Sequence, residues 1–386
     1  MSALPEARTW PRLHDAQRRV LLEVLIHGAQ SRVAIARRLG LSRTSLTRLV
    51  RELVELGFVE EGDVHLRPTR GRPPELLNVR PNAAHLLGVK LTGDALYAVV
   101  TDLTAQVVAS EEHRLSSRSV DDVVGLIGDV AGSLLSGREL PAAVGVCLAG
   151  DVRRSGGEEF VDRSLFLGWD GVPLASLVSA ATGLPAVTSN DVQALAAGHH
   201  WFGAGVQLTS MVVFGIGAGI GAGVVSGDEL VSGAHGRPGK IGHARLPSSL
   251  GTGAPCHHGH DTCVHSFVTM PAIEFNAGVA AGSYGEAVSR ARAGDEAAVR
   301  AFRLSAYALG VVVAQFVNVL DPQKVVVTGE GTDMLDLAPR DFEKALADQL
   351  EDNHVADGVV IDRQPFEFTH YARGAAVGAL RSLLSE

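Results

Sequence analysis

The sequence predicts an α/β protein in two parts, with a small helical domain over residues 1–80 and a large α/β body over residues 81–386. Three observations support this division. The chain has 386 residues, which is more than one ordinary domain holds. Three helical patterns separated by glycines fill residues 15–57, and from Ala84 onward strand-like and helix-like segments alternate. The apolar fraction of 46% and the charged fraction of 20% are typical of a packed globular protein.

The first part contains three consecutive helices with recognisable start and stop residues. The apolar positions recur at helical spacing, and serines that can cap a helix precede the second and third patterns. A glycine ends each pattern, as expected for a helix C-terminus. The turn Leu39-Gly40-Leu41-Ser42 is short and contains glycine, which is typical of a helix-turn-helix. The expected helices are residues 15–27, 32–39 and 43–56, with caps at Ser31 and Ser42 and stops at Gly28, Gly40 and Gly57.

After the third helix the pattern changes to that of a β-hairpin. Phe58-Val59-Glu60 and Val64-His65-Leu66 flank a polar turn at Gly62-Asp63, which predicts a wing. In the following Gly71-Arg72-Pro73-Pro74, the prolines stiffen the chain beside Arg72, and such an arginine can enter a minor groove. We therefore predict a winged helix-turn-helix domain.

The outward face of the third helix indicates what this domain binds. Its side chains are hydroxyls and guanidinium groups, which reach base edges and phosphates when a helix lies in the major groove. Residues 1–80 carry 14 arginines, no lysine and 9 acidic residues, whereas the rest of the chain is strongly acidic. The alternative is a helical dimerisation or protein-binding module with a solvated arginine face. The expected DNA-binding residues are Ser42, Arg43, Thr44, Ser45, Thr47, Arg48, Arg51 and Arg72.

The composition also indicates the cellular compartment in which the protein works. The sequence has no run of about 18 apolar residues, which a membrane span would need, and the N-terminal residues lack the apolar core of a signal peptide. Three cysteines are too few for a disulfide framework. We expect a cytoplasmic protein with no membrane partner.

One segment of the body has the residue types of a metal site. Cys256, His258 and Cys263, with His243 upstream, provide two thiolates and two imidazoles, which are tetrahedral zinc ligands. Four protein ligands leave no open position, so the expected zinc is structural. His257 and His260 are rival ligands, and a histidine-rich surface loop with incidental cysteines is the alternative.

Both parts of the chain resemble the ROK family (repressor, open reading frame, kinase). The segments SRVAIARRLGLSRTSLTRLVRELVELGFVEE and GRPPELLNVRP carry the resemblance over residues 15–81. LGWDGVPLASLVSAATGLPAVTSNDVQALAAG, GIGAGIGAGVVSGDELVSGAHGRPGKIGHARL and CHHGHDTCVH carry it over residues 84–384. The resemblance implies an actin-like, ribonuclease-H-like sugar-kinase fold of two α/β lobes, with a zinc loop near residues 243–265. His258 stands where these proteins have the middle cysteine of Cys-x-Cys-x4-Cys.

The kinase loops of the family are altered in this sequence. Actin-like kinases place an Asp-x-Gly-x-Thr loop after the first strand, and here the run begins at Lys90 and ends at Asp94, whose charge would repel phosphate. The glycine-rich second loop has Ala218 where kinases have a hydroxyl, and Thr328-Gly329-Glu330-Gly331 resembles a degraded adenosine loop. The match of Ser189-Asn190-Asp191 to Glu-Asn-Asp leaves Asp191 as a vestigial base. We expect no kinase activity, and the alternative is a sugar kinase with an accessory DNA-binding arm.

The resemblance also implies an effector pocket with changed chemistry. Asn190, Asp191 and His243 match the sugar-binding positions of ROK proteins, whereas Lys240 and His265 replace two glutamates, and Phe166 replaces an asparagine. These changes favour an anionic sugar derivative, whose charge Lys240 and His265 would pair with. The alternative is a pocket that has lost its ligand and a body that binds a protein partner. We expect a sugar-responsive regulator, a homodimer or tetramer, that binds operator DNA and acts as a repressor of carbohydrate-related genes.

Overall fold

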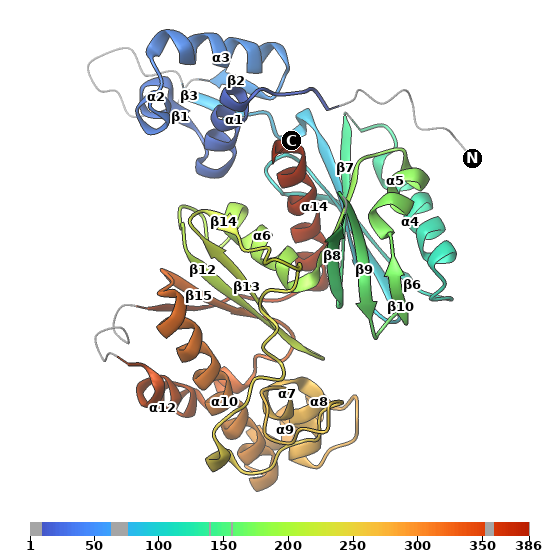
Figure 1. The fold of residues 1–386 in the computed structure, drawn as a ribbon, viewed down its shortest axis with the longest axis vertical. Coiled ribbons are helices and arrows are strands. Elements are labelled where there is room, and N and C mark those ends of the chain that lie inside the picture. Colours follow the sequence, from blue (N-terminus) through green and yellow to red (C-terminus); the bar gives the residue numbers. More distant parts are fainter. Residues whose placement is uncertain (1–9, 63–75, 139, 156, 352–358, 386) are drawn as a thin grey trace. The chain divides into compact units, whose positions relative to one another are not determined.

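The computed structural model describes residues 10–62, 76–138, 140–155, 157–351 and 359–385. The chain divides into two compact units (Figure 1). The first unit comprises residues 1–207 and 368–386, and the second comprises residues 208–367. The winged helix-turn-helix belongs to the first unit together with the first α/β lobe, and the second unit is the second lobe.

The N-terminal helices form as the sequence predicts. They are α1 (Asp15–His27), α2 (Arg32–Leu39) and α3 (Arg43–Glu55). The Ser31 hydroxyl accepts the Ala34 N–H at 3.2 Å, and the Ser42 hydroxyl accepts the Ser45 N–H at 3.0 Å, so both predicted caps are confirmed. The helices pack through fully buried apolar side chains at helical spacing, among them Leu21, Ile35, Leu46, Leu49 and Leu53.

The wing differs from the prediction in its second strand. Strand β2 (Val59–Gly62) pairs antiparallel with β3 (Leu76–Val79), which also pairs with β1 (Gln30–Ser31). The expected partner, Val64-His65-Leu66, and Arg72 both lie outside the described residues. Leu77 of β3 is 1% exposed and supplies the apolar contact that fixes this strand in the domain.

The first lobe is built on a five-stranded sheet in the order β11-β7-β4-β5-β6. The pairs β4–β5 and β5–β6 are antiparallel, whereas β7 and β11 run parallel to β4. A smaller sheet in the order β10-β9-β8 follows β7. The strands are β4 (His85–Leu91), β5 (Ala95–Thr101), β6 (Val107–Arg114), β7 (Pro141–Leu148), β8 (Asp151–Ser155), β9 (Glu158–Ser164), β10 (Trp169–Val172) and β11 (Ala186–Asn190).

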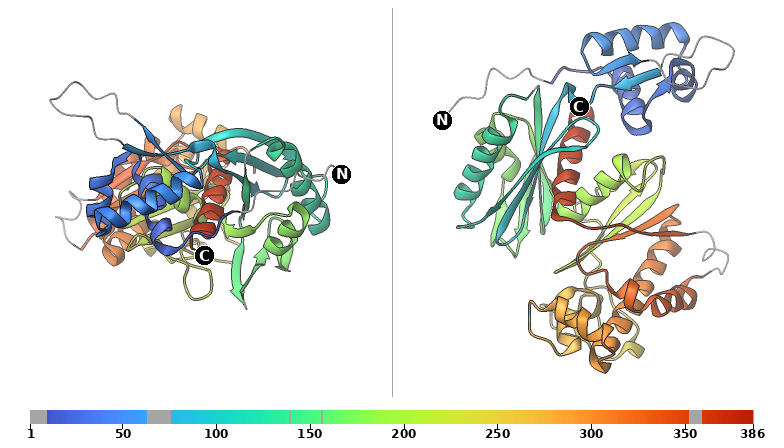
Figure 2. Two further views of the ribbon diagram at one scale, coloured as in Figure 1. Left: turned by 90° about the horizontal axis from the view of Figure 1, so that it is seen from above. Right: turned by 180° about the vertical axis from the view of Figure 1, so that it is seen from behind.

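Helices cover both faces of this sheet (Figures 1 and 2). The apolar side chains of Leu87, Val89 and Leu91 pack towards α4 (Val120–Leu135) and α5 (Leu174–Thr182). The opposite face meets α14 (Phe368–Ser385), which also packs on α6 (Asp191–Phe202). This contact is close, since a Cβ on Gly88 would lie 1.9 Å from the Ala372 carbonyl oxygen. Because side chains alternate along a strand, Lys90 lies on the α14 face, like Gly88.

The second lobe repeats this topology. Its sheet has the order β14-β13-β12-β15-β16, in which β12–β13 and β13–β14 are antiparallel and β15 and β16 run parallel to β12. The strands are β12 (Met211–Ile216), β13 (Ile220–Ser226), β14 (Glu229–Leu230), β15 (Lys324–Thr328) and β16 (Val360–Arg363). The helices are α7 (His265–Val268), α8 (Met270–Ala277), α9 (Tyr284–Arg292), α10 (Glu296–Leu320), α11 (Met334–Leu337) and α12 (Pro339–Gln349). This repeated sheet is the predicted actin-like, ribonuclease-H-like architecture.

Helix α10 forms the centre of the second core. Thirteen of its residues are buried, including Phe302, Leu309 and Val313. Among the described helices it is the one long and apolar enough to span a membrane, and 56% of its most apolar window is buried inside the lobe. A single helix of this kind is weak evidence for a membrane span, because buried core helices have the same composition.

Candidate functional site

The polar face of α3 is presented to solvent, with one exception. Six of the seven predicted contact residues on this helix and its cap are exposed, and Ser45 is half-buried. Ser42 caps the helix, and its hydroxyl also donates to the Ser45 hydroxyl at 2.9 Å. These two residues therefore hold the first turn in shape. The exposed residues are Ser42, Arg43, Thr44, Thr47, Arg48 and Arg51.

An acidic residue orients one of the arginines. Glu52 accepts a hydrogen bond from Arg48 at 3.1 Å and another from Gln17 of α1 at 3.0 Å. The Arg48 side chain remains 62% exposed. Because Gln17 is buried between helices, Glu52 connects the position of Arg48 to the packing of α1 on α3. Arg51 pairs with Glu55 at 3.4 Å in the same i, i+4 manner.

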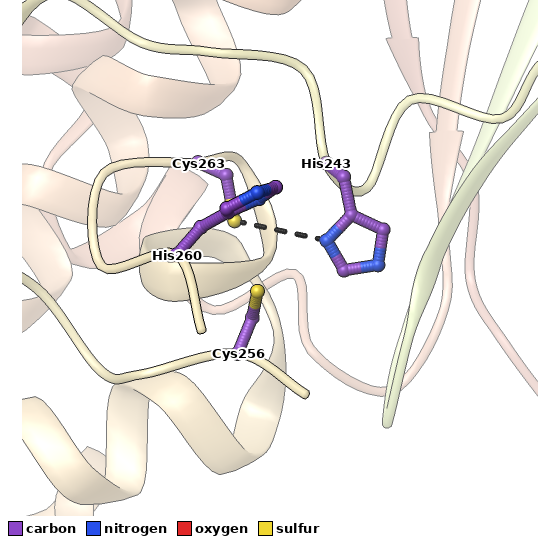
Figure 3. Close-up of side chains that lie close together, drawn as sticks. All are labelled: His243, Cys256, His260 and Cys263. Atoms are coloured by element: carbon purple, nitrogen blue, oxygen red, sulfur yellow. Dashed lines mark hydrogen bonds between the residues drawn. The ribbon is translucent and has the colours of Figure 1, made fainter. Parts of the chain in front are cut away.

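Four side chains of the second unit converge as metal ligands would (Figure 3). The ligand atoms of His243, Cys256, His260 and Cys263 all lie within 4.8 Å of one another. Cys263 is fully buried, and its Sγ lies 3.9 Å from Nδ1 of His243. The loop is held by its own backbone, since the Cys256 N–H donates to the His260 carbonyl at 2.7 Å. Two thiolates and two imidazoles at this spacing fit a tetrahedral zinc ion.

The fourth ligand in this geometry differs from the sequence prediction. Nδ1 of His260 is buried and has no hydrogen-bond partner among the described residues, which suits a metal ligand. His258 is exposed and belongs to a second group with His243 and His257. Spacing along the chain favoured His258, but the tight turn after Cys256 directs His260 inward instead. The arrangement of the described residues therefore favours His260, whereas the sequence favoured His258.

Burial and neighbouring imidazoles shift the proton affinities in this cluster. Desolvation, followed by the charges of His257 and His258, lowers the pKa of His243 to about 4. Desolvation and His257 also lower the pKa of His265, whose ring stacks on His243 with centroids 5.8 Å apart. Desolvation opposes ionisation of Cys256, but the backbone N–H groups of His258 and His260 outweigh it and lower the pKa of this thiol. Neutral imidazole is the form that binds a metal ion.

In the first unit, the predicted effector residues meet a lysine. Asn190 caps α6, its Oδ1 accepts the Val192 N–H at 2.9 Å, and its Nδ2 donates to the Gly150 carbonyl at 3.0 Å. Asp191 accepts a hydrogen bond from Nζ of Lys90 at 2.6 Å. Sequence reasoning identified Lys90 as a lost kinase aspartate and missed its pairing with Asp191. The available signal was topological, because both residues lie at the carboxyl ends of parallel strands in one sheet.

The remaining effector candidates belong to the second unit or to the small sheet. Lys240 is exposed, and His265 and His243 are half-buried with parallel rings. Phe166 is 48% exposed in the turn between β9 and β10. The backbone of this turn lies against the first hairpin, since a Cβ on Gly93 would be 3.2 Å from the Phe166 carbonyl oxygen.

These parts define a winged-helix protein with a duplicated ribonuclease-H-like body. A model of the ROK family matches residues 86–380, and a model of the MarR family matches residues 13–67. The first match spans well over half of the chain, so the chain belongs to the ROK family. Both the family and the N-terminal winged-helix domain were expected from the sequence and are confirmed.

Known proteins with this architecture include regulators and enzymes. A putative xylose repressor from Caldicellulosiruptor sp. (strain Rt8B.4) is 25% identical over 347 residues, which cover 82% of this chain and 84% of the relative. A crystal structure of a ROK family transcriptional regulator, a homologue of the E. coli MLC protein, matches with a TM-score of 0.81 at 21% identity over 96% of both chains. A ROK family glucokinase from Streptomyces griseus, in complex with glucose and AMPPNP, matches with a TM-score of 0.64 at 24% identity over 77% of this chain and all of the glucokinase. The body fold is common to both classes, so the site residues must distinguish them.

Proposed function

We propose that the chain is a sequence-specific DNA-binding transcriptional regulator, a cytoplasmic repressor of carbohydrate-related genes. The observation that carries this proposal is the exposed hydroxyl and arginine face of α3 in a winged-helix domain attached to a ROK body. The similarity to a protein named as a xylose repressor supports the same class. As a homodimer or tetramer, the protein would present two copies of α3 to two half-sites of an operator.

The body acts in this proposal as a sensor and not as a kinase. A base must be free to take the proton of the attacking hydroxyl, and Asp191 is held by Lys90. The second glycine-rich loop has an acidic neighbour, because a Cβ on Gly217 would lie 2.3 Å from Oε2 of Glu330. Asp94 adds a carboxylate to the first loop. Carboxylates at both loops oppose phosphate binding, so the alternative of a sugar kinase is disfavoured.

The effector in this proposal is a sugar derivative with a negative charge. By resemblance to ROK sugar sites, the candidate contact residues are Asn190, Asp191, Lys240, His243 and His265. The two basic residues would pair with its charge. A body that responds to a protein partner is the competing view, and an effector that changes DNA affinity would exclude it.

A structural zinc ion completes the proposal. His243, Cys256, His260 and Cys263 would hold it, with His260 in place of the originally favoured His258. The ion would fix the loop that carries His243 and precedes His265. Neither thiolate is then available for other chemistry.

Selection from a random duplex library tests the DNA-binding function. The full-length protein is expected to enrich one pseudo-palindromic sequence with half-sites about 34–36 Å apart or a multiple of that spacing. A double variant, Arg43→Ala with Arg48→Ala, should enrich none, while Arg290→Ala on α9 serves as a matched surface control. Failure of the wild-type protein to enrich any sequence would refute the proposed function.

A further inference from the structure

The ion pair between Lys90 and Asp191 lies inside the first lobe. Nζ of Lys90 and Oδ2 of Asp191 are 2.6 Å apart, and the two side chains are 5% and 13% exposed. The Tyr371 ring of α14 lies 4.5 Å from the same Nζ. Lys90 is placed by β4, Asp191 by the end of β11, and Cys147 of β7 lies between the two strands. Burial raises the pKa of Cys147 to about 12, so the thiol beside the pair is neutral.

The pair occupies the groups that a neutral sugar would use. A sugar hydroxyl binds a carboxylate by donating to one of its oxygens. Oδ2 of Asp191 already accepts from Lys90, and Oδ1 accepts the Val192 N–H at 3.0 Å. Both ends of the Asn190 amide are likewise bonded to backbone groups. Each carboxylate oxygen keeps a second lone pair, but a neutral hydroxyl that donates there meets a carboxylate whose charge Lys90 already neutralises, so the bond is weaker than one to an unpaired Asp191.

The Lys90 ammonium group makes the position beside Asp191 attractive to an anionic group of a ligand. A lysine has three N–H donors, and among the described residues Nζ has one hydrogen bond, to Asp191, and one ring contact, to Tyr371. A carboxylate or phosphate oxygen of a ligand can accept from the same ammonium without displacing Asp191. The low polarity of the surrounding core strengthens such a bond.

We propose that Lys90 is a specificity-determining residue, which excludes neutral sugars from Asp191 and requires an effector with an anionic oxygen at this position. The inference rests on the proposed function, because it takes Asp191 as part of the effector site. It adds Lys90 to Lys240 and His265 as a residue whose positive charge would select an anionic effector.

Thermal unfolding of the full-length protein with defined probes tests this inference. The neutral probes are D-glucose, D-xylose, D-mannose and N-acetyl-D-glucosamine, and the anionic probes are D-glucuronate and D-glucose 6-phosphate. Wild type should respond to no neutral probe and to at least one anion, whereas Lys90→Ser should gain a shift of about 2–4 °C with a neutral probe. The two anions separate carboxylate from phosphate recognition.

Matched variants separate specificity from stability. Lys90→Arg keeps the cation and should behave like wild type, and Lys344→Ser removes a lysine from an exposed pair with Asp348 and should also behave like wild type. Lys90→Gln keeps a donor to Asp191 without the charge and replaces Lys90→Ser if that variant does not fold. The inference would be overturned if a neutral probe raised the melting temperature of wild type as much as that of Lys90→Ser or Lys90→Gln. It would also be overturned if neither of these variants were stabilised by a neutral probe, or if neither anion stabilised wild type. Enrichment of operator DNA by the same samples remains the separate test of the proposed function.

Discussion

The hairpin β4–β5 of the first lobe and the hairpin β12–β13 of the second occupy the same place in two sheets of the same topology. In the first turn, Thr92 donates from its hydroxyl to Asp94 at 2.8 Å and from its backbone N–H to the Ala95 carbonyl at 2.9 Å. In the second, the Gly217 N–H donates to the Gly219 carbonyl at 2.9 Å, with the Glu330 carboxylate against Gly217. By resemblance to actin-like kinases these turns would face phosphate, and in this chain a carboxylate lies beside each of them. The two hairpins therefore share one topology while the side chains at their equivalent positions differ in chemistry.

The largest expected loss of stability comes from replacing Gly88, because its neighbours are backbone atoms and not a side chain that can move. Gly88→Ala places a Cβ 1.9 Å from the Ala372 carbonyl oxygen, so α14 must move away from the sheet. We expect a loss of about 4 kcal/mol or more in the free energy of unfolding, measured by urea denaturation. Gly217→Ala meets the end of the flexible Glu330 side chain and should lose less than about 2 kcal/mol. Equal losses of unfolding free energy in the two variants would contradict the claim that Gly88 contacts rigid backbone and Gly217 a flexible side chain.

Metal removal is expected to affect the second lobe selectively. Cys263→Ser deletes a fully buried proposed ligand, and we expect the zinc content to fall and the melting temperature to drop by roughly 6–12 °C, for about 3 kcal/mol. Metal content by mass spectrometry distinguishes the two candidate imidazoles. His260→Ala should lose the ion, while His258→Ala should keep it. The reverse pattern would restore the ligand set that sequence spacing favoured.

A smaller loss of stability is expected at acidic pH. The pKa of His243 is lowered to about 4 from its ordinary value of 6.5, so the folded protein binds fewer protons than the unfolded chain between these values. Stability therefore decreases as the pH falls from about 6.5 towards 4, and metal binding adds to the same trend because it requires neutral imidazole. The metal-free protein should melt at a lower temperature at pH 5 than at pH 7. His243→Asn should reduce this difference, and an unchanged pH dependence in that variant would contradict the assignment.

Local rules account for what the sequence could predict. Ser31 and Ser42 cap helices by contacts with residues three positions away, so their role follows from the neighbouring sequence. The alternation of strands and helices after Ala84 was predicted because strands such as His85–Leu91, Ala95–Thr101 and Lys324–Thr328 are apolar runs bounded by turn residues. The family resemblance gave the two-lobe fold.

Contacts between distant residues account for what the sequence could not predict. Lys90 and Asp191 are 101 positions apart, and their pairing depends on β4, β7 and β11 lying side by side. The choice of Leu76–Val79 as the wing strand depends on its pairing with both β1 and β2. Likewise, the chain spacing favoured His258, whereas the buried Nδ1 of His260 and its proximity to Cys256 and Cys263 identify the imidazole that faces inward.

The affinity of the full-length protein for its selected operator is the most direct test of the central claim that this ROK chain is a DNA-binding regulator. Fluorescence anisotropy should show that Arg43→Ala and Arg48→Ala each weaken binding by about 1–3 kcal/mol, or roughly 5- to 150-fold in Kd, with unchanged melting temperature. Arg290→Ala should bind like wild type. Equal affinities for all four proteins would contradict the assignment of α3 as the DNA-contacting helix.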